Sequence, residues 1–170
     1  FTRLNPLRFL KKFAPVMGFA FSTATSNATI PMNIDTLEEK IGVNRRISSF
    51  TIPLGATINM DGTSIMQGVA VVFVAQAFGI TLTPADYLTG IATATLASIG
   101  TAGVPSVGLI TLAMVFDSVG LPVAGIGLIM GIDRILDMAR TAVNITGDAV
   151  CTTIVAHQDG ALDKSVFNKN

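Results

Sequence analysis

The hydrophobic pattern divides the chain into apolar stretches that are separated by short polar connectors. Two of them, residues 50–80 and 123–157, are long enough to cross a bilayer, because a crossing helix needs about 20 apolar residues. Two others, residues 13–39 and 88–118, are divided near the middle by runs of small and hydroxyl residues. The arm before the first break is too short to cross, so both divided stretches are predicted to be re-entrant helical hairpins.

Lysine and arginine are absent from a long central part of the chain. Between Arg46 and Arg134 there is neither residue, and the connectors in that part carry only acidic charge. Because cytoplasmic connectors are enriched in lysine and arginine, the acidic connectors are predicted to lie outside. The same rule places three segments in the cytoplasm: residues 1–12, 40–48 and 158–170.

This order and orientation predict an all-α membrane protein built as an inverted repeat, with one hairpin entering from each side. Inverted repeats are typical of secondary transporters. The second-last crossing is predicted to break at "NMDGT", residues 59–63. The predicted segments are a first re-entrant hairpin at about 8–48, a broken transmembrane helix at 49–80, a second re-entrant hairpin at 87–120, the last transmembrane helix at 123–157 and the tail at 158–170.

Composition supports this class. Hydrophobic residues make up 50% of the chain and charged residues only 13%, whereas soluble domains are about a quarter charged. The formal net charge is zero, which gives no indication of a nucleic-acid partner. No nucleophile elbow, phosphate loop or histidine pair is present, so no enzyme activity is predicted.

One polar stripe runs through the apolar segment "DRILDMARTAVNITGD", residues 133–148. At 100° per residue, one side of a helix carries Asp133, Asp137, Arg140, Thr141, Asn144 and Asp148. Ionisable residues inside a membrane usually mark a substrate or ion path, although an internal salt-bridge network is the alternative. Together with Asp61 there are four carboxylates against Arg134 and Arg140, so protons or cations are expected to balance them.

Three further segments carry polar groups at membrane depth. Thr57, Asn59 and Asp61 offer hard oxygen donors of the kind that alkali cations prefer, although a simple turn at Asp61 is the alternative. The hairpin tips are "TATSNATIP", residues 23–31, and "SIGTAGVPS", residues 98–106. Free N–H groups where half-helices begin attract carboxylates, but small-residue runs also pack helices together.

The segments "NMDGT", "SIGTAGVP" and "DMARTAVNITGD" resemble the signature segments of the dicarboxylate/amino acid:cation symporter family, which includes glutamate and aspartate transporters. The resemblance runs from about Pro6 to Ala156, in family order and spacing. It covers only the C-terminal part of a family member and leaves out six preceding helices and the scaffold that forms the trimer. It therefore implies a multi-pass protein of the plasma (inner) membrane, in contact with lipid, that is a homotrimer at full length.

The resemblance also implies roles for individual residues toward a small anionic amino acid. Arg140 would pair with the side-chain carboxylate of the substrate, and Asp137 would hold its amino group. The remaining substrate contacts would come from Thr63, Thr141 and Asn144, from Thr25 and Ser26 at the first tip, and from Val104 through Gly108 at the second.

Sodium ions are the coupling ions that the resemblance implies, and no other cofactor is expected. One sodium would be held by the Gly55 carbonyl with Asn59, Asn144 and Asp148. A second would use Thr57 with carbonyls of Ser98, Ile99 and Thr101, and Asn59 and Asp61 would help to hold a third.

We therefore expect sodium-coupled symport of glutamate or aspartate by alternating access. The first tip departs from the family pattern, because Asn27 replaces a serine and Ala24 stands where some members carry arginine. Within the family, proton-coupled, C4-dicarboxylate and cystine symport are the alternatives. An anion channel or a non-transporting membrane fragment are the alternatives outside it.

Overall fold

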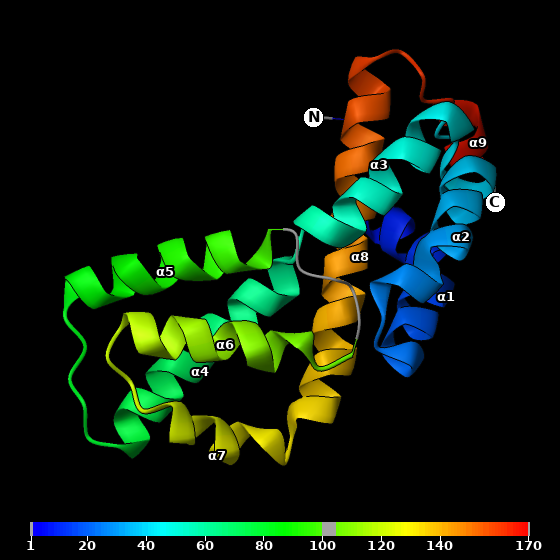
Figure 1. Ribbon diagram of the computed structural model, residues 1–170. Coiled ribbons are helices and arrows are strands. Elements are labelled where there is room, and N and C mark those ends of the chain that lie inside the picture. Colours follow the sequence, from blue (N-terminus) through cyan, green and yellow to red (C-terminus); the bar gives the residue numbers. More distant parts are fainter. Residues whose placement is uncertain (1, 100–104, 170) are drawn as a thin grey trace.

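Helices make up the architecture, and they pair into two hairpins and two interrupted helices (Figure 1). The computed structural model describes residues 2–99 and 105–169, and these contain no β-strand. The elements are α1 (Pro6–Thr23), α2 (Ser26–Thr36), the π-helix η1 (Leu37–Ile41), α3 (Arg45–Ile58), α4 (Asp61–Ala77), α5 (Pro84–Ser98), α6 (Val107–Ser118), the 3₁₀ turn η2 (Val123–Gly125), α7 (Ile126–Met130), α8 (Asp133–Gln158) and α9 (Lys164–Asn168).

The first hairpin consists of α1 and α2. The Asn5 side chain caps α1 by accepting from the backbone N–H of Leu7 at 3.0 Å, and Pro6 occupies the first turn. The helix ends at Thr23, and the next residue, Ala24, is in the left-handed conformation with φ 52°. Thr25 is extended and starts α2, so the chain reverses within two residues.

The second hairpin consists of α5 and α6. Thr83 and Asp86 form a capping box at the start of α5, in which the Thr83 N–H donates to Asp86 Oδ2 at 2.7 Å. That backbone N–H, with the Thr83 hydroxyl, holds the pKa of the Asp86 carboxyl below its usual value. Gly120, with φ 68°, then turns the chain out of α6 toward η2.

Both long segments are interrupted. The chain leaves the helical conformation at Asn59 and Met60, inside "NMDGT", so α3 and α4 are separate helices. The predicted single helix at 123–157 is instead η2, α7 and α8, with a turn at Gly131 and Ile132. The glycines of "GIGLIMGI" explain this difference, since glycine is a poor helix former.

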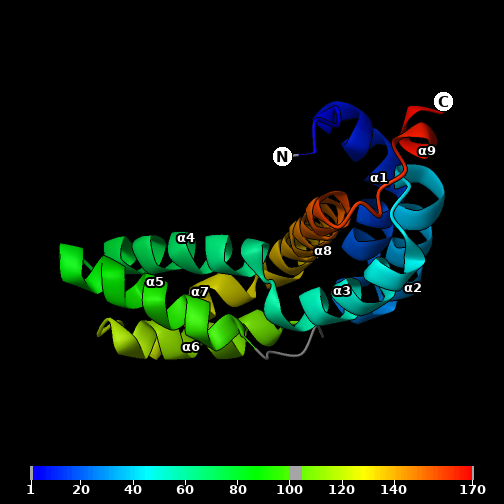
Figure 2. The same cartoon turned by 90° about the horizontal axis from the view of Figure 1, so that it is seen from above.

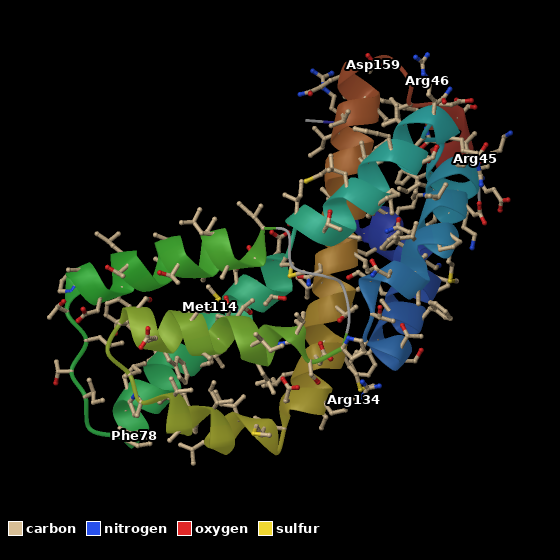
Figure 3. All side chains as sticks on the ribbon, in the orientation of Figure 1. Arg45, Arg46, Phe78, Met114, Arg134 and Asp159 are labelled. Carbon is tan, nitrogen blue, oxygen red and sulfur yellow. The ribbon has the colours of Figure 1, made fainter. Side chains whose placement is uncertain are left out.

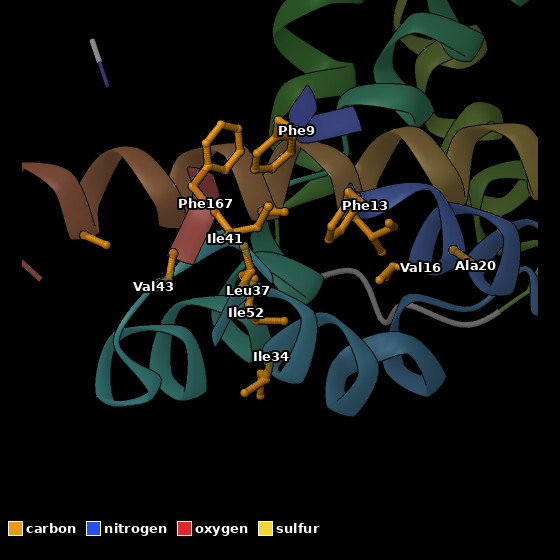
Figure 4. Packing of buried hydrophobic residues seen from close by; sticks show 13 residues of the cluster. Phe9, Phe13, Val16, Ala20, Ile34, Leu37, Ile41, Val43, Ile52 and Phe167 are labelled. Atoms are coloured by element: carbon orange, nitrogen blue, oxygen red, sulfur yellow. The ribbon is translucent and has the colours of Figure 1, made fainter. Parts of the chain in front are cut away.

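Two hydrophobic cores lie on opposite sides of α8. The first joins the first hairpin, α3 and the C-terminal half of α8 (Figure 4), and the second joins α4 to α7. Figures 1 and 2 show α4 to α7 extending to one side of α8 and the first hairpin packed on the other. The polar stripe of α8 therefore lies between the two cores.

One helical stretch among the described residues, Arg45–Ala77, is long and apolar enough to cross a membrane, and half of its most apolar window is buried. Large apolar side chains are exposed along the second hairpin, including Leu88 (70%), Leu96 (71%) and Ile110 (70%). Figure 3 shows Met114 on the same hairpin. Such extended apolar surface is typical of contact with lipid or with other protein.

The segment after α8 folds back onto the base of the first hairpin. Phe167 is 2% exposed and belongs to the first core. The Asn44 N–H donates to the Ala161 carbonyl at 3.0 Å, and the Asp163 N–H donates to the Gly42 carbonyl at 2.8 Å. The tail is therefore packed against the fold at this end.

We expect Phe167→Ala to release the tail, because truncating a buried phenylalanine costs about 3–5 kcal/mol. Hydrogen exchange of the full-length protein checks this: the Asp163 and Asn44 amides should lose protection. Phe50→Ala is the matched control, since Phe50 is 70% exposed. Unchanged protection in Phe167→Ala would show that the tail is held by its backbone contacts alone.

Candidate functional site

The polar face of α8 is buried where the two cores meet. The six residues of the predicted stripe are each no more than 6% exposed: Asp133, Asp137, Arg140, Thr141, Asn144 and Asp148. Arg134 and Asp61, which enter the charge balance of the sequence, are exposed. The buried face of α8 therefore carries three carboxylates against one guanidinium, which is the same excess of two carboxylates that the sequence suggests.

Arg140 is the centre of this face. Its Nε donates to Asp137 Oδ1 at 2.9 Å, and its Nη2 lies 2.7 Å from the same oxygen. Asp133 Oδ1 is 3.8 Å from Nη1, which is an ion pair without a hydrogen bond. One carboxylate thus orients the guanidinium from the side, through Nε.

Both Nη atoms of Arg140 are buried and have no hydrogen-bond acceptor among the described residues. Of the five guanidinium N–H groups, only that of Nε is well aligned with an acceptor. Leaving buried charged donors unpaired costs more than leaving neutral ones unpaired. The arrangement fits a planar, bidentate acceptor such as a carboxylate.

The second hairpin lies against this pair of residues. The Ser106 N–H, just before α6, donates to Asp137 Oδ2 at 2.7 Å. Ser106 has φ 61°, a left-handed conformation that is uncommon for a residue other than glycine. A Cβ on Gly108 would collide with Nη1 of Arg140, so only glycine lets α6 approach the guanidinium so closely.

The break between α3 and α4 faces the same part of α8. The Gly62 N–H, free because it lies in the first turn of α4, donates to Asn144 Oδ1 at 2.7 Å. Asn144 Nδ2 donates to the Thr63 hydroxyl at 3.3 Å. A Cβ on Gly62 would lie 2.5 Å from the Arg140 carbonyl oxygen, so this backbone contact also requires glycine.

A group of oxygens lies one turn further along α8. Asn59 Nδ2 donates to Asp148 Oδ1 at 2.9 Å and to the Asn144 carbonyl at 3.4 Å. A Cβ on Gly55 would be 2.5 Å from Asp148 Oδ1, and Asp61 Oδ2 packs against Gly147. All four residues expected at the first cation site are therefore close together. Among the described residues, no three His, Cys, Asp or Glu side chains form a metal-binding group.

Other predicted site residues have local partners. The Thr141 hydroxyl donates to the Asp137 carbonyl at 2.8 Å and is buried beside the stripe. The exposed Thr57 hydroxyl donates to the Leu54 carbonyl at 2.8 Å, within its own helix.

At the hairpin tips, the Ser98 hydroxyl donates to the Thr95 carbonyl at 2.8 Å, and the next residue, Ile99, is 53% exposed. Thr25 is the N-cap residue of α2, and Ser26 is 6% exposed. Thr101 and Val104 lie outside the described residues.

Several residues at the site are not in the predicted set. They are Gly62, which contributes a backbone N–H group, Gly147, and the buried pair Gln67 and Thr111, in which Gln67 Nε2 donates to the Thr111 hydroxyl at 2.7 Å. Gln67 lies four residues after Thr63, so helical spacing from "NMDGT" was a usable signal for it. A cavity of about 430 Å³ between α4, α7 and α8 is lined almost wholly by apolar side chains, and Arg140 is its one charged lining residue among the described residues.

Comparison with known proteins identifies the family of the chain. The model of the sodium:dicarboxylate symporter family matches residues 1–158. An excitatory amino acid transporter of Caenorhabditis elegans is 46% identical over 160 residues, which are 94% of this chain and 32% of that protein. Neutral amino acid transporter A of Homo sapiens is 44% identical over 157 residues, 92% of this chain and 30% of that protein.

Excitatory amino acid transporter 2 of Homo sapiens is 42% identical over 156 residues, covering 92% of this chain and 27% of that protein. The chain thus spans about a third of the length of these relatives. Because the family match covers nearly the whole chain, the chain belongs to the sodium:dicarboxylate symporter family.

Proposed function

We propose that the full-length protein is a secondary symporter that moves an acidic amino acid, glutamate or aspartate, across the plasma (inner) membrane together with sodium, by alternating access. The observation that carries this proposal is the buried guanidinium of Arg140, whose Nη groups have no acceptor among the described residues. Relatives named excitatory and neutral amino acid transporters support an amino acid as the substrate class.

Arg140 would bind the side-chain carboxylate of the substrate through Nη1 and Nη2. Its Nε remains engaged by Asp137 at 2.9 Å, which keeps the guanidinium plane oriented. Asp137 Oδ2 accepts one hydrogen bond, from the Ser106 N–H, and retains lone pairs for a substrate ammonium group. A dicarboxylate without an amino group would leave this carboxylate poorly compensated, which favours an amino acid over a C4-dicarboxylate.

Thr63, Thr141 and Asn144 would complete the polar wall, since all three are buried beside Arg140. The hairpins of α1–α2 and α5–α6 would be re-entrant, and their tips, with Thr25, Ser26 and Val104 through Gly108, would close over the substrate. The Ser106–Asp137 hydrogen bond supports the second tip as the gate, because substrate binding at Asp137 would act directly on it. The remaining two thirds of the protein would provide the scaffold of a homotrimer.

Charge balance supports sodium coupling. The buried face of α8 has two more carboxylates than guanidinium groups, and uncompensated buried charge is costly. The Asn59 amide nitrogen lies between Asp148 Oδ1 and the Asn144 carbonyl, so a positive partial charge already occupies this oxygen group. Turning the Asn59 amide over would present Oδ1 instead, and sodium, a hard cation, would then be the compensating charge.

Two further sodium ions are proposed on weaker contacts. One would be held by the Thr57 hydroxyl with carbonyls of Ser98, Ile99 and Thr101, which requires Thr57 to turn from the Leu54 carbonyl. The other would use Asn59 and Asp61 together with ligands from outside this chain. The packing of both side chains against Gly147 supports their action as a pair.

Uptake of radiolabelled aspartate into liposomes by the full-length protein tests the function. Concentrative uptake is expected with an inward sodium gradient. Uptake driven only by a proton gradient would show that protons, not sodium ions, are the coupling ions. A preference for succinate or cystine would show that the substrate is not glutamate or aspartate. Downhill anion flux without concentration would indicate a channel, and no flux would indicate a non-transporting protein.

Arg140→Thr should raise the KM for aspartate by at least about 100-fold, because hydrogen bonds to charged groups contribute about 1.5–3 kcal/mol each. Serine or alanine uptake should persist or increase in this variant. Arg134→Thr is the matched control, since it removes an exposed arginine from the same helix. An unchanged KM for aspartate in Arg140→Thr would assign Arg140 a structural role only.

Asp148→Asn should raise the sodium concentration for half-maximal uptake by about tenfold or more, because cation affinity depends on ligand charge. The sodium dependence of aspartate uptake is the measurement. Asp159→Asn, at the exposed end of α8, removes the same charge outside the site. Equal sodium dependence in both variants would show that Asp148 is not a ligand of the coupling sodium.

A further inference from the structure

A second charged site lies at the base of the first hairpin, apart from the polar face of α8. A cavity of about 710 Å³ is lined by three segments that are far apart in the sequence: the start of α1, the end of η1 and the tail. Among the described residues, its charged lining consists of Arg8, Lys11, Lys12, Lys40 and Lys169 with one carboxylate, Glu39. The cavity therefore concentrates positive charge in a chain whose net charge is zero.

Four of these five cations are lysines, and their contacts decide how much of the positive charge is compensated. Lys12 Nζ donates only to backbone carbonyls, among them Phe167 at 2.8 Å and Lys169 at 2.9 Å. Among the described residues, the four lysines of the cavity form no ion pair with a carboxylate, Glu39 included. Four lysines without a carboxylate partner among the described residues favour an anionic ligand.

The helix α1 has three distinct faces that suit the edge of a membrane. Phe9, Phe13, Val16 and Ala20 form its buried face. The cavity face carries Arg8, Lys11, Lys12 and Pro15, at the spacing i, i+3, i+4 and i+7. Beside it, Leu7 is 78% exposed and Leu10 is 41% exposed. Cationic and exposed apolar residues side by side on one helix are typical of the interface between headgroups and acyl chains.

The cavity also lies at the end of the molecule that the distribution of lysine and arginine assigns to the cytoplasm. Arg45, Arg46 and Asp159 lie together at this end in Figure 3, and the hydrogen bond from the Asn44 N–H to the Ala161 carbonyl joins their segments. Clusters of four to eight lysines and arginines next to a membrane segment bind the anionic lipids of the cytoplasmic leaflet.

We infer that this cavity binds the headgroup of an anionic phospholipid, such as phosphatidylserine, from the cytoplasmic leaflet. The lipid phosphate and carboxylate would contact Lys11, Lys40 and Lys169, and the acyl chains would lie along Leu7 and Leu10. Because the cavity is lined by α1, η1 and the tail, the bound lipid would stabilise the packing of these three segments at the base of the first hairpin. This site is separate from transport, so its test does not depend on the substrate.

Native mass spectrometry of the full-length protein in detergent, titrated with dioctanoyl phosphatidylserine, tests this inference. The double substitution Lys11→Gln and Lys40→Gln should weaken one binding event per protomer by about 20-fold, since each lysine near an anionic lipid contributes about fivefold. The double substitution Arg46→Gln and Lys164→Gln is the matched control, because it removes two charges from the same end outside the cavity. Lys12 is left unchanged because it holds the tail in place.

Three results would overturn the inference. Equal weakening by both double variants would indicate general surface charge rather than a site. Equal binding of dioctanoyl phosphatidylcholine would show that the anionic headgroup is not recognised. Displacement of phosphatidylserine by inorganic phosphate at equal concentration would make this a site for free phosphate, since the acyl chains would then contribute nothing.

Discussion

The buried ion pair between Arg140 and Asp137 is the constraint to which the rest of the structure is adapted. A guanidinium and three carboxylates on one face of an apolar helix are stable only when other groups surround and compensate them. In this chain, the surrounding groups are mainly backbone groups of neighbouring helices rather than additional side chains. Gly62 and Gly108 bring α4 and α6 close to Arg140, and a methyl group at either position would collide with it.

The interruptions of the helices belong to the same arrangement. A helix that starts in the interior exposes backbone N–H groups that need acceptors. The start of α4 directs the Gly62 N–H to Asn144, and the residue before α6 directs the Ser106 N–H to Asp137. Broken backbone and buried side chains thus satisfy each other, which explains why the breaks occur next to the polar stripe of α8.

The two hairpins are held in different ways. The base of the first is fixed by the tail, through Phe167 in the core and the carbonyl contacts of Lys12. The second contacts the rest of the molecule through the Gln67–Thr111 pair, through Ser106 and Asp137, and through apolar packing on α4. This asymmetry supports the proposal that the second hairpin is the gate. A lipid bound at the base of the first hairpin would hold that hairpin still more firmly than the second.

The sequence by itself determined the helical class, the family, the break at "NMDGT" and the membership of the polar stripe, because these depend on periodicity, composition and local motifs. It did not reveal the interruption at Gly131 and Ile132, since isolated glycines also occur within continuous helices. It also counted Arg134 and Asp61 in the charge balance, whereas both are exposed, so the excess of two buried carboxylates is unchanged. Only the tertiary structure decided which donors remain unpaired, which glycines contact Arg140 and where the tail packs, because these depend on distances between segments that are far apart in the chain.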